Sequence, residues 1–287
     1  MAVKKVNDSS LTSVADAIRT KGGTSAQLYF PDGFIDAIEA IPTGGGGYDD
    51  LLDLLAGEAS GDLVISGVTN TQRTQFQFSG TNNCNNNVTS LEFPDLEYAY
   101  INTGSLDAGF FSYPYSAPQI RSIRLPKCKM LMMHNTQKSD YANCFQNLTT
   151  LYTPELTVLD GCLRGSGLTS FAAPKLSNFI GSSNMFVNCT ALEYADLGVI
   201  TSGCLNFSGS TKLSALVFRA ASVCPLSATS KLNNTLIASG TGYIYVPRDL
   251  INSYESATNW STYAGQFRAL EDYTADGTIS GEFIMPT

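Results

Sequence analysis

The residue types that supply acid–base and metal chemistry are scarce in this sequence. Its one histidine, His134, lies in the run MLMMHNTQ, and the G-x-S-x-G, H-E-x-x-H and phosphate-loop patterns do not occur. Histidine supplies most acid–base catalysis near neutral pH, so a catalytic triad or histidine metal cluster is difficult to build around one copy. Two carboxylates can suffice for glycoside hydrolysis, which the acidic residues alone leave open. We expect no enzyme activity and no catalytic, cofactor-binding or metal-binding residues.

A small acidic cluster is the one other candidate for binding a cation. It consists of Asp49, Asp50, Asp53 and Glu58. Carboxylates are good ligands for calcium, but this spacing does not match the calcium-loop pattern. We therefore interpret the cluster as the solvated face of a short helix.

The cysteines recur in a way that indicates packing. Seven cysteines are spread over residues 84–224 without any C-x-x-C pair. Cys189 follows Phe186 at the offset at which Ser166 follows Leu163, and Ser210 follows Phe207 in the same way. Serine could not replace a nucleophile or metal ligand so freely, but either residue fits a tight inner corner. We predict reduced, buried thiols at Cys144, Cys162, Cys189 and Cys204, while a disulfide or a chemical role for some cysteines stays open.

These cysteines belong to a repeat, which must position every other residue. Six segments align, and proline holds position 7 in the first four. They start at Val88, Ile120, Leu148, Leu168, Leu192 and Leu213. Apolar or small residues recur at positions 1, 4, 9 and 12, and stacked repeats bury such a stripe continuously. We predict parallel segments with the residues of position 4 in one inward row. Four members of that row are Leu151, Phe171, Ala195 and Leu216.

The repeated unit L-x-x-L-x-x-P-x-L, alternating with F-x-x-C-x-x-L, resembles the BspA-type leucine-rich repeat. The resemblance covers roughly residues 88–270, although the segments at Leu192 and Leu213 lack the proline and the first two carry long insertions. It implies an α+β repeat fold: a leucine-rich-repeat solenoid with a small helical N-terminal module and a strand–helix C-terminal cap. Solenoids of this family act at cell surfaces and in contacts with a host.

The expected C-terminal cap spans residues 241–273, ahead of an extension over 274–287. It begins with the strand-like run YIYV, after which Pro247 opens a helix carrying Ile251 and Tyr254 at helical spacing. Trp260, the only tryptophan, lies just beyond. We interpret Trp260 as a plug over the last repeat, with exposed aromatic binding as the lesser alternative.

The N-terminal stretch forms a separate module over residues 1–41. The run DSSLTSVADAIRTKGG is typical of a short amphipathic helix, and FPDGFIDAIEAI indicates a second one. The glycine-rich hinge at 42–47 separates this module from a cap over 48–87 and from the repeats over 88–240. A module of about 40 residues is marginal alone, so we expect it to pack on a partner or on copies of itself.

This module resembles a short N-terminal module of tail and fibre proteins from phages of gut Gram-positive bacteria. There it precedes a glycine linker and a variable C-terminal domain, and FPDGFIDAI is the most specific part of the match. The resemblance implies that residues 1–41 anchor the chain to other virion proteins while the repeats face outward. It also implies a location in the virion, and the small size of the module leads us to expect a homo-oligomer there.

Charge and hydropathy limit the partners. The chain has 17 basic and 25 acidic residues, a net charge of −8, and no dense basic cluster, which excludes nucleic acid as an expected partner. No apolar run is long enough for a signal peptide or a membrane span. We therefore expect a protein made in the host cytoplasm, without membrane insertion.

The insertion at 103–119 supplies the candidate recognition residues. They are Phe110, Phe111, Tyr113 and Tyr115. Aromatic side chains clustered on a loop suit stacking on sugar rings or an interface hot spot, although one or two of them could instead fold back into the core. We expect a non-enzymatic phage virion protein of the tail-fibre or receptor-binding type that recognises a bacterial surface polymer or protein. The alternatives are a structural virion component, such as a capsid decoration or baseplate protein, and a bacterial surface adhesin.

Overall fold

The computed structural model describes residues 15–16, 59–69, 87–99, 120–133, 146–161, 163–181, 184–203 and 205–272. The chain separates into two compact units, Met1–Gly45 and Gly46–Thr287. Ala15 and Asp16, both helical, are the described residues of the first unit. All other described residues belong to the second unit, and the finer domain boundaries stay predictions.

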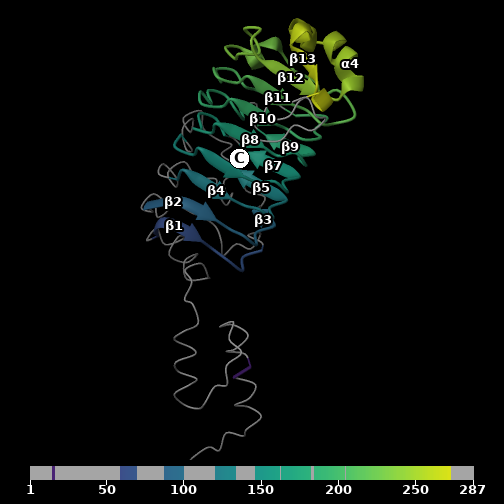
Figure 1. The fold of residues 1–287 in the computed structure, drawn as a ribbon. Coiled ribbons are helices and arrows are strands. Elements are labelled where there is room, and N and C mark those ends of the chain that lie inside the picture. Colours follow the sequence, from purple (N-terminus) through teal and green to yellow (C-terminus); the bar gives the residue numbers. More distant parts are fainter. Residues whose placement is uncertain are drawn as a thin grey trace, which may run out of the picture. The chain divides into compact units, whose positions relative to one another are not determined.

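The second unit contains two parallel sheets, and from β2 to β9 the chain alternates between them (Figure 1). The larger sheet has nine strands in the order β1-β2-β4-β6-β8-β10-β11-β12-β13. Its strands are β1 Ser60–Val64, β2 Asn87–Glu92, β4 Ser122–Arg124, β6 Thr150–Tyr152, β8 Ser170–Ala172, β10 Tyr194–Asp196, β11 Ala215–Val217, β12 Tyr243–Val246 and β13 Phe267–Ala269. The smaller sheet has the order β3-β5-β7-β9, with β3 Tyr98–Ala99, β5 Met130–Met133, β7 Val158–Gly161 and β9 Asn178–Gly181.

Helical segments occur only late in the described part of the second unit. They are the 3₁₀ helices η3 Thr229–Leu232, η4 Arg248–Leu250, η5 Trp260–Gln266 and η6 Leu270–Asp272, and the α-helix α4 Ile251–Ser256. Within the described ranges, no helix is long and apolar enough to cross a bilayer.

The predicted fold class, an α+β leucine-rich-repeat solenoid, is therefore wrong. The fold is a mostly parallel two-sheet arrangement of the α/β-like kind, with short helical segments. An α+β repeat requires a helix in each unit, but the residues after each early proline turn here form a short strand of the smaller sheet. Val158, for example, follows the turn at Pro154 within four residues and begins β7. So short a connection, followed by β-forming residues, leaves no room for a helix.

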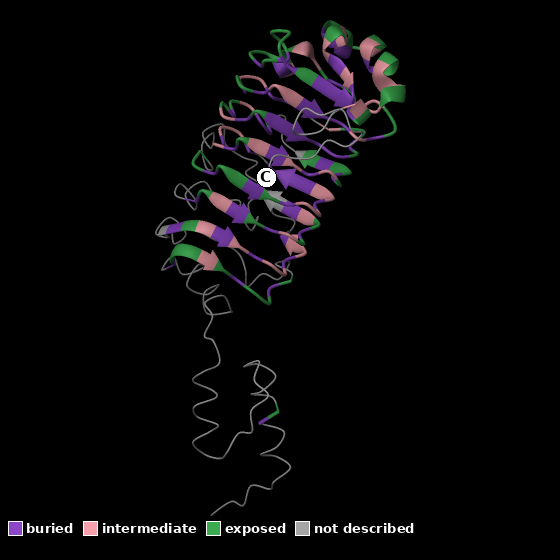
Figure 2. Cartoon of the chain, viewed as in Figure 1, coloured by how far each residue is buried: buried purple, intermediate pink, exposed green. Residues whose placement is uncertain are grey.

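The predicted inward row of position-4 residues is confirmed. Ala195 pairs with Phe171 on one side and with Leu216 on the other. The registered pair Tyr152↔Ala172 then places Leu151 beside Phe171. The same row continues through Leu91, Ile123, Ile244 and Phe267. Figure 2 shows these buried positions repeating from strand to strand along the unit, where parallel strands with one buried face share a single register.

Ion pairs between successive turns complement this register. Lys127 Nζ lies 2.8 Å from Asp95 Oδ1, and Lys129 Nζ lies 2.7 Å from Glu97 Oε2. These side chains are exposed, so each pair contributes at most about 1 kcal/mol. The pairs therefore favour the register without being the main source of stability.

Aromatic packing closes the core near the C-terminal strands. Trp260 is fully buried and lies 5.7 Å from Phe218 and 5.8 Å from Tyr254 between ring centroids. Its indole Nε1 donates to the carbonyl of Cys224 at 2.7 Å. The prediction that Trp260 is buried is confirmed, and the indole N–H is satisfied as a buried donor requires.

Candidate functional site

The four aromatic residues proposed for recognition, Phe110, Phe111, Tyr113 and Tyr115, lie outside the described residues. The same is true of His134 and of the acidic cluster at 49–58. Among the residues that the structure does describe, no group of three His, Cys, Asp or Glu side chains could hold a metal ion. The candidate binding site among the described residues lies on one face of the larger sheet.

Side-chain alternation gives this sheet an outer face with two rows that flank the inward row. The first row consists of Asp62, Ser90, Ser122, Thr150, Ser170, Tyr194, Ala215 and Tyr243. The second row consists of Val64, Glu92, Arg124, Tyr152, Ala172, Asp196, Val217, Tyr245 and Arg268. We call this surface the outer face.

The outer face changes character along the sheet. From β2 to β8 its side chains are polar or small and at least partly exposed. On β10 to β12 a second apolar cluster contains Tyr194, Val217 and Tyr245, all at most 9% exposed, together with Leu270. The part available to a ligand is therefore the stretch over β2 to β8.

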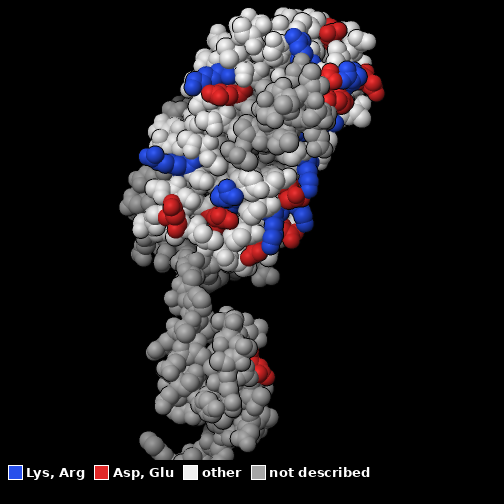
Figure 3. All heavy atoms as spheres, in the orientation of Figure 1, with Lys and Arg blue, Asp and Glu red and all other residues white. Residues whose placement is uncertain are grey.

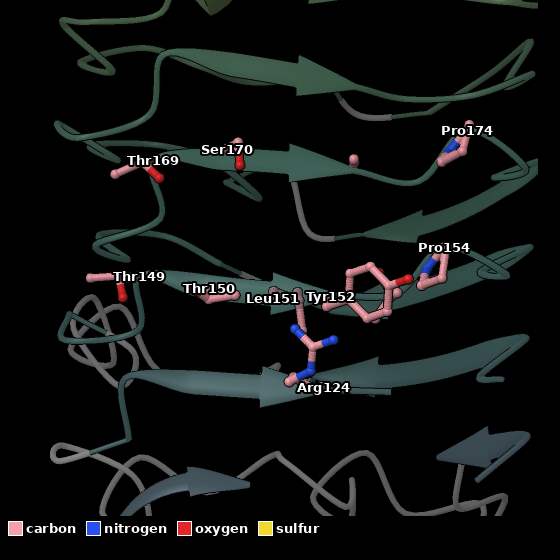
Figure 4. A pocket seen from close by; sticks show the side chains of 11 residues that line it. Arg124, Thr149, Thr150, Leu151, Tyr152, Pro154, Thr169, Ser170 and Pro174 are labelled. Carbon is pink, nitrogen blue, oxygen red and sulfur yellow. The ribbon is translucent and has the colours of Figure 1, made fainter. Parts of the chain in front are cut away.

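A hollow of about 540 Å³ lies on this open stretch, over β6 and β8 (Figure 4). It runs along the two strands, from Thr149 and Thr169 at one end to Pro154 and Pro174 at the other. The remaining lining residues are Arg124, Thr150, Leu151, Tyr152, Thr153, Ser170 and Ala172. The volume falls within the range of about 300–1,000 Å³ usual for small-molecule sites.

The hollow lies where two neighbouring strands of the larger sheet are paired over the shortest length. β6 and β8 share one registered pair, Tyr152↔Ala172, whereas β6 shares three pairs with β4 and β8 shares three with β10. Ala172 also carries only a methyl group in the outer row. Loose pairing and a small side chain together leave the space that the hollow occupies.

Tyr152 and Arg124 form the most distinctive feature of this site. The Arg124 guanidinium carbon lies 4.5 Å from the centroid of the Tyr152 ring, a cation–π contact. The Arg124 Nε lies 3.6 Å from Oε2 of Glu92 on the neighbouring strand. Tyr152 nevertheless stays 41% exposed. An aromatic ring with accessible surface thus stands at the hollow, and Glu92 offsets the charge of its partner.

Thr153, which follows Tyr152, carries a buried hydroxyl. It lies one residue past the end of β6, at a place where the other strands are followed by buried apolar residues: Ile65, Phe93, Leu125, Ala173, Leu197 and Phe218. Thr153 is 1% exposed, and its Oγ1 makes no hydrogen bond within the described part of the chain. A buried hydroxyl without a partner is unfavourable by about 1–3 kcal/mol. Because this oxygen is buried, a ligand in the hollow does not reach it.

The lining of the hollow is rich in groups that form hydrogen bonds. It holds one cation, Arg124, four further hydroxyl side chains besides Thr153 and Tyr152, and two prolines, but no carboxylate, histidine, cysteine or lysine. The exposed hydroxyl groups can both donate and accept hydrogen bonds to a ligand.

A buried carboxylate farther along the outer face is structural. Asp196 is fully buried and accepts hydrogen bonds from Arg219 Nε at 2.8 Å and from the Gly198 N–H at 2.9 Å. Burial raises the pKa of Asp196, and the charge of Arg219 acts in the opposite direction. Gly198 has φ +58° with no room for a Cβ, which would lie 2.5 Å from the Ala173 carbonyl oxygen. Since Asp196 is inaccessible and paired, it is no candidate for ligand contact.

The described cysteines are also structural. Cys128, Cys189 and Cys224 are free and buried, as predicted for Cys189, whereas Cys84, Cys144, Cys162 and Cys204 lie outside the described residues. Burial raises the pKa of Cys128 to about 11 and that of Cys224 to about 12. These thiols therefore stay protonated and unreactive near neutral pH.

The interchange of cysteine and serine has a clear geometric basis. Cys189 Sγ donates to the Leu163 carbonyl at 3.1 Å and lies 3.4 Å from Ser166 Oγ. Ser210 Oγ makes the corresponding bond to the Phe186 carbonyl at 2.7 Å. Thiol and hydroxyl thus play one role, a small buried donor to the preceding turn.

Comparison with protein-family models, with curated proteins and with solved structures finds no match to this chain. The resemblances of the repeat and of the N-terminal module therefore remain interpretations of the sequence. Sequence reasoning missed the hollow, although a signal for it exists. Position 5 of the aligned segments reads Glu92, Arg124, Tyr152 and Ala172, and position 6 brings Thr153 into an apolar column.

Proposed function

We propose that this chain is a non-enzymatic phage virion protein of the tail-fibre or receptor-binding type that recognises the surface of a bacterial host. The open outer face over β2 to β8 is the recognition surface. The N-terminal module, through its resemblance to tail and fibre modules, joins the chain to other virion proteins and to copies of itself.

The observation that carries this proposal is the hollow beside Tyr152. It combines an exposed aromatic ring, a charge-balanced arginine and a row of hydroxyls. Aromatic and arginine side chains are the residues that most often dominate binding energy at recognition surfaces. The lining also contains no histidine, carboxylate, lysine or cysteine, which favours binding over turnover.

A competition assay tests the proposal. Purified full-length chain is mixed with cells of Gram-positive gut strains before phage particles carrying the protein are added, and unadsorbed particles are counted. We expect the wild-type chain to reduce adsorption. Tyr152→Ala should compete poorly, because it removes the exposed ring of the hollow.

Tyr243→Ala is the matched control for this assay. Tyr243 is 36% exposed on the same outer face, carries Arg268 at 4.3 Å from its ring centroid, and lies outside the lining of the hollow. This variant should compete as the wild type does. Absence of any competition, together with normal adsorption of particles that lack the protein, would instead favour a capsid decoration or baseplate role.

A further inference from the structure

The charged side chains at the hollow indicate which class of ligand it binds. Arg124 is the one cation in its lining, and Glu92 lies 3.6 Å from the Arg124 Nε. Recognition of a phosphate or carboxylate polymer relies on cations that remain available for charge-assisted hydrogen bonds. In this lining the single positive charge already has an anionic neighbour and an aromatic ring as partners. The electrostatics therefore favour an uncharged ligand.

The wider surface agrees with this assignment. On the face seen in Figure 3, most of the described surface is uncharged, and several basic side chains lie next to acidic ones. Near the hollow, Lys175 Nζ pairs with Glu155 Oε2 at 2.6 Å. These ion pairs balance the charges beside the hollow, so they offer little attraction to an anionic polymer.

The Tyr152 ring and the hydroxyl groups around it indicate which chemical groups the ligand presents. The guanidinium of Arg124 occupies one face of the Tyr152 ring, and the exposed remainder of the ring stands beside the hollow. An aromatic surface packs well against the C–H face of a sugar ring. Around it, Thr149, Thr150, Thr169 and Ser170 supply groups that donate and accept, as sugar hydroxyls require.

We infer that the hollow binds an uncharged sugar residue of a surface glycan, with the sugar ring against Tyr152 and sugar hydroxyls hydrogen-bonded to the threonine and serine side chains along its lining. This inference rests on the proposed function and names the ligand class that the outer face recognises. It also distinguishes neutral glycans from anionic wall polymers, which share the same bacterial surface.

The test is binding of the labelled full-length chain to an array of defined glycans. The array carries neutral oligosaccharides of glucose, galactose, rhamnose and N-acetylglucosamine, and anionic probes of polyglycerol phosphate and polyuronate. We expect retention on at least one neutral glycan, with little change when the salt concentration is raised to about 1 M, where exposed charges are screened within about 3 Å.

Variants locate that binding in the hollow. Tyr152→Ala should weaken it about tenfold or more, as loss of a central aromatic contact does. Tyr152→Phe keeps the ring and should retain most of the affinity. Tyr243→Ala should bind as the wild type does. Because Tyr152 is exposed, unchanged thermal unfolding of its variants separates lost contact from lost fold.

Three results would overturn the inference. The first is retention only on the anionic probes, with affinity falling as salt rises. The second is neutral-glycan binding that survives Tyr152→Ala. In the third, the chain competes for adsorption to cells but is retained by no glycan, so the proposed function stands while the sugar assignment fails. Failure of both competition and glycan binding would remove the proposed function as well.

Discussion

Replacing Thr153 by valine should make the protein more stable. The side chain is 1% exposed in a row of apolar residues, and its hydroxyl makes no hydrogen bond within the described ranges. Valine has nearly the same shape and replaces the hydroxyl by a methyl group. The folded state then no longer holds an unsatisfied polar group, while the unfolded state loses only a solvated one.

The expected gain follows from the cost of burying a hydroxyl without a partner. That cost is about 1–3 kcal/mol, so we expect Thr153→Val to raise the free energy of unfolding by about 1–2 kcal/mol. For a folded unit of 150–250 residues, 1 kcal/mol corresponds to about 2–4 °C in Tm, which gives an increase of about 2–8 °C. Urea unfolding should show a higher midpoint at an unchanged slope.

Thr235→Val is the matched control, because Thr235 is as buried as Thr153 but its hydroxyl forms hydrogen bonds. Thr235 is 2% exposed, and its Oγ1 donates to the Leu232 carbonyl at 2.7 Å and accepts from the Ala238 N–H at 3.1 Å. The same substitution should therefore lower the free energy of unfolding, by about 1–2 kcal/mol. If both variants lost stability equally, the Thr153 hydroxyl would have a partner in solution and the reasoning would fail.

Three further perturbations probe the core and the buried charge. Arg219→Met should destabilise by roughly 3 kcal/mol near neutral pH, because it leaves Asp196 buried without its cation. Burial raises the pKa of Asp196 in the folded state, so protonation relieves the penalty and the loss should shrink as the pH falls toward about 4; a pH-independent loss would contradict this. Cys189→Ser should cost less than about 1 kcal/mol, and native thiol labelling should be slow; rapid labelling would place that thiol at the surface. Phe186→Ala should cost about 3–5 kcal/mol in urea unfolding, since the ring is buried in a stack, whereas Ile180→Ala, 49% exposed, should cost little. Equal losses for these last two would refute the assigned core.

The inward positions could be predicted from the sequence because burial imposes a strict period. Leu151, Phe171, Ala195 and Leu216 share position 4 of the aligned segments, and parallel pairing brings them together. Serine at the place of Cys189 likewise predicted a small residue in a tight inner corner, and the structure adds that this residue donates a hydrogen bond. Both predictions depend on residue types that fit only a buried position.

The fold class could not be predicted by the same reasoning. Periodic apolar residues around a proline turn are compatible with a strand followed by a helix. They are equally compatible with two strands that belong to different sheets. The short connection between the turn at Pro154 and Val158 favours a second strand over a helix. Val158 then pairs with Met130 and Asn178 in the smaller sheet. Such pairing is between distant residues, which a local pattern does not record.

The hollow was not predicted because the aromatic residues of the insertion at 103–119 form the more conspicuous cluster in the sequence. Tyr152 occupies an ordinary outward position of the third segment, and only its neighbours make it distinctive. Arg124 and Ala172 lie 28 residues before and 20 residues after it in the chain, and strand pairing brings both beside it.

The departures from the repeat gather at one place, which is the strongest reason to regard the hollow as functional. Ala172 interrupts the outer row with the smallest side chain on the open stretch, and Thr153 interrupts an apolar inner row with a hydroxyl. The ladder is shortest between the two strands that carry these residues. The unsatisfied Thr153 hydroxyl lowers stability, and a sequence optimised only for folding would carry valine at this position. Where several local rules are broken together beside an exposed ring, binding explains them better than packing does.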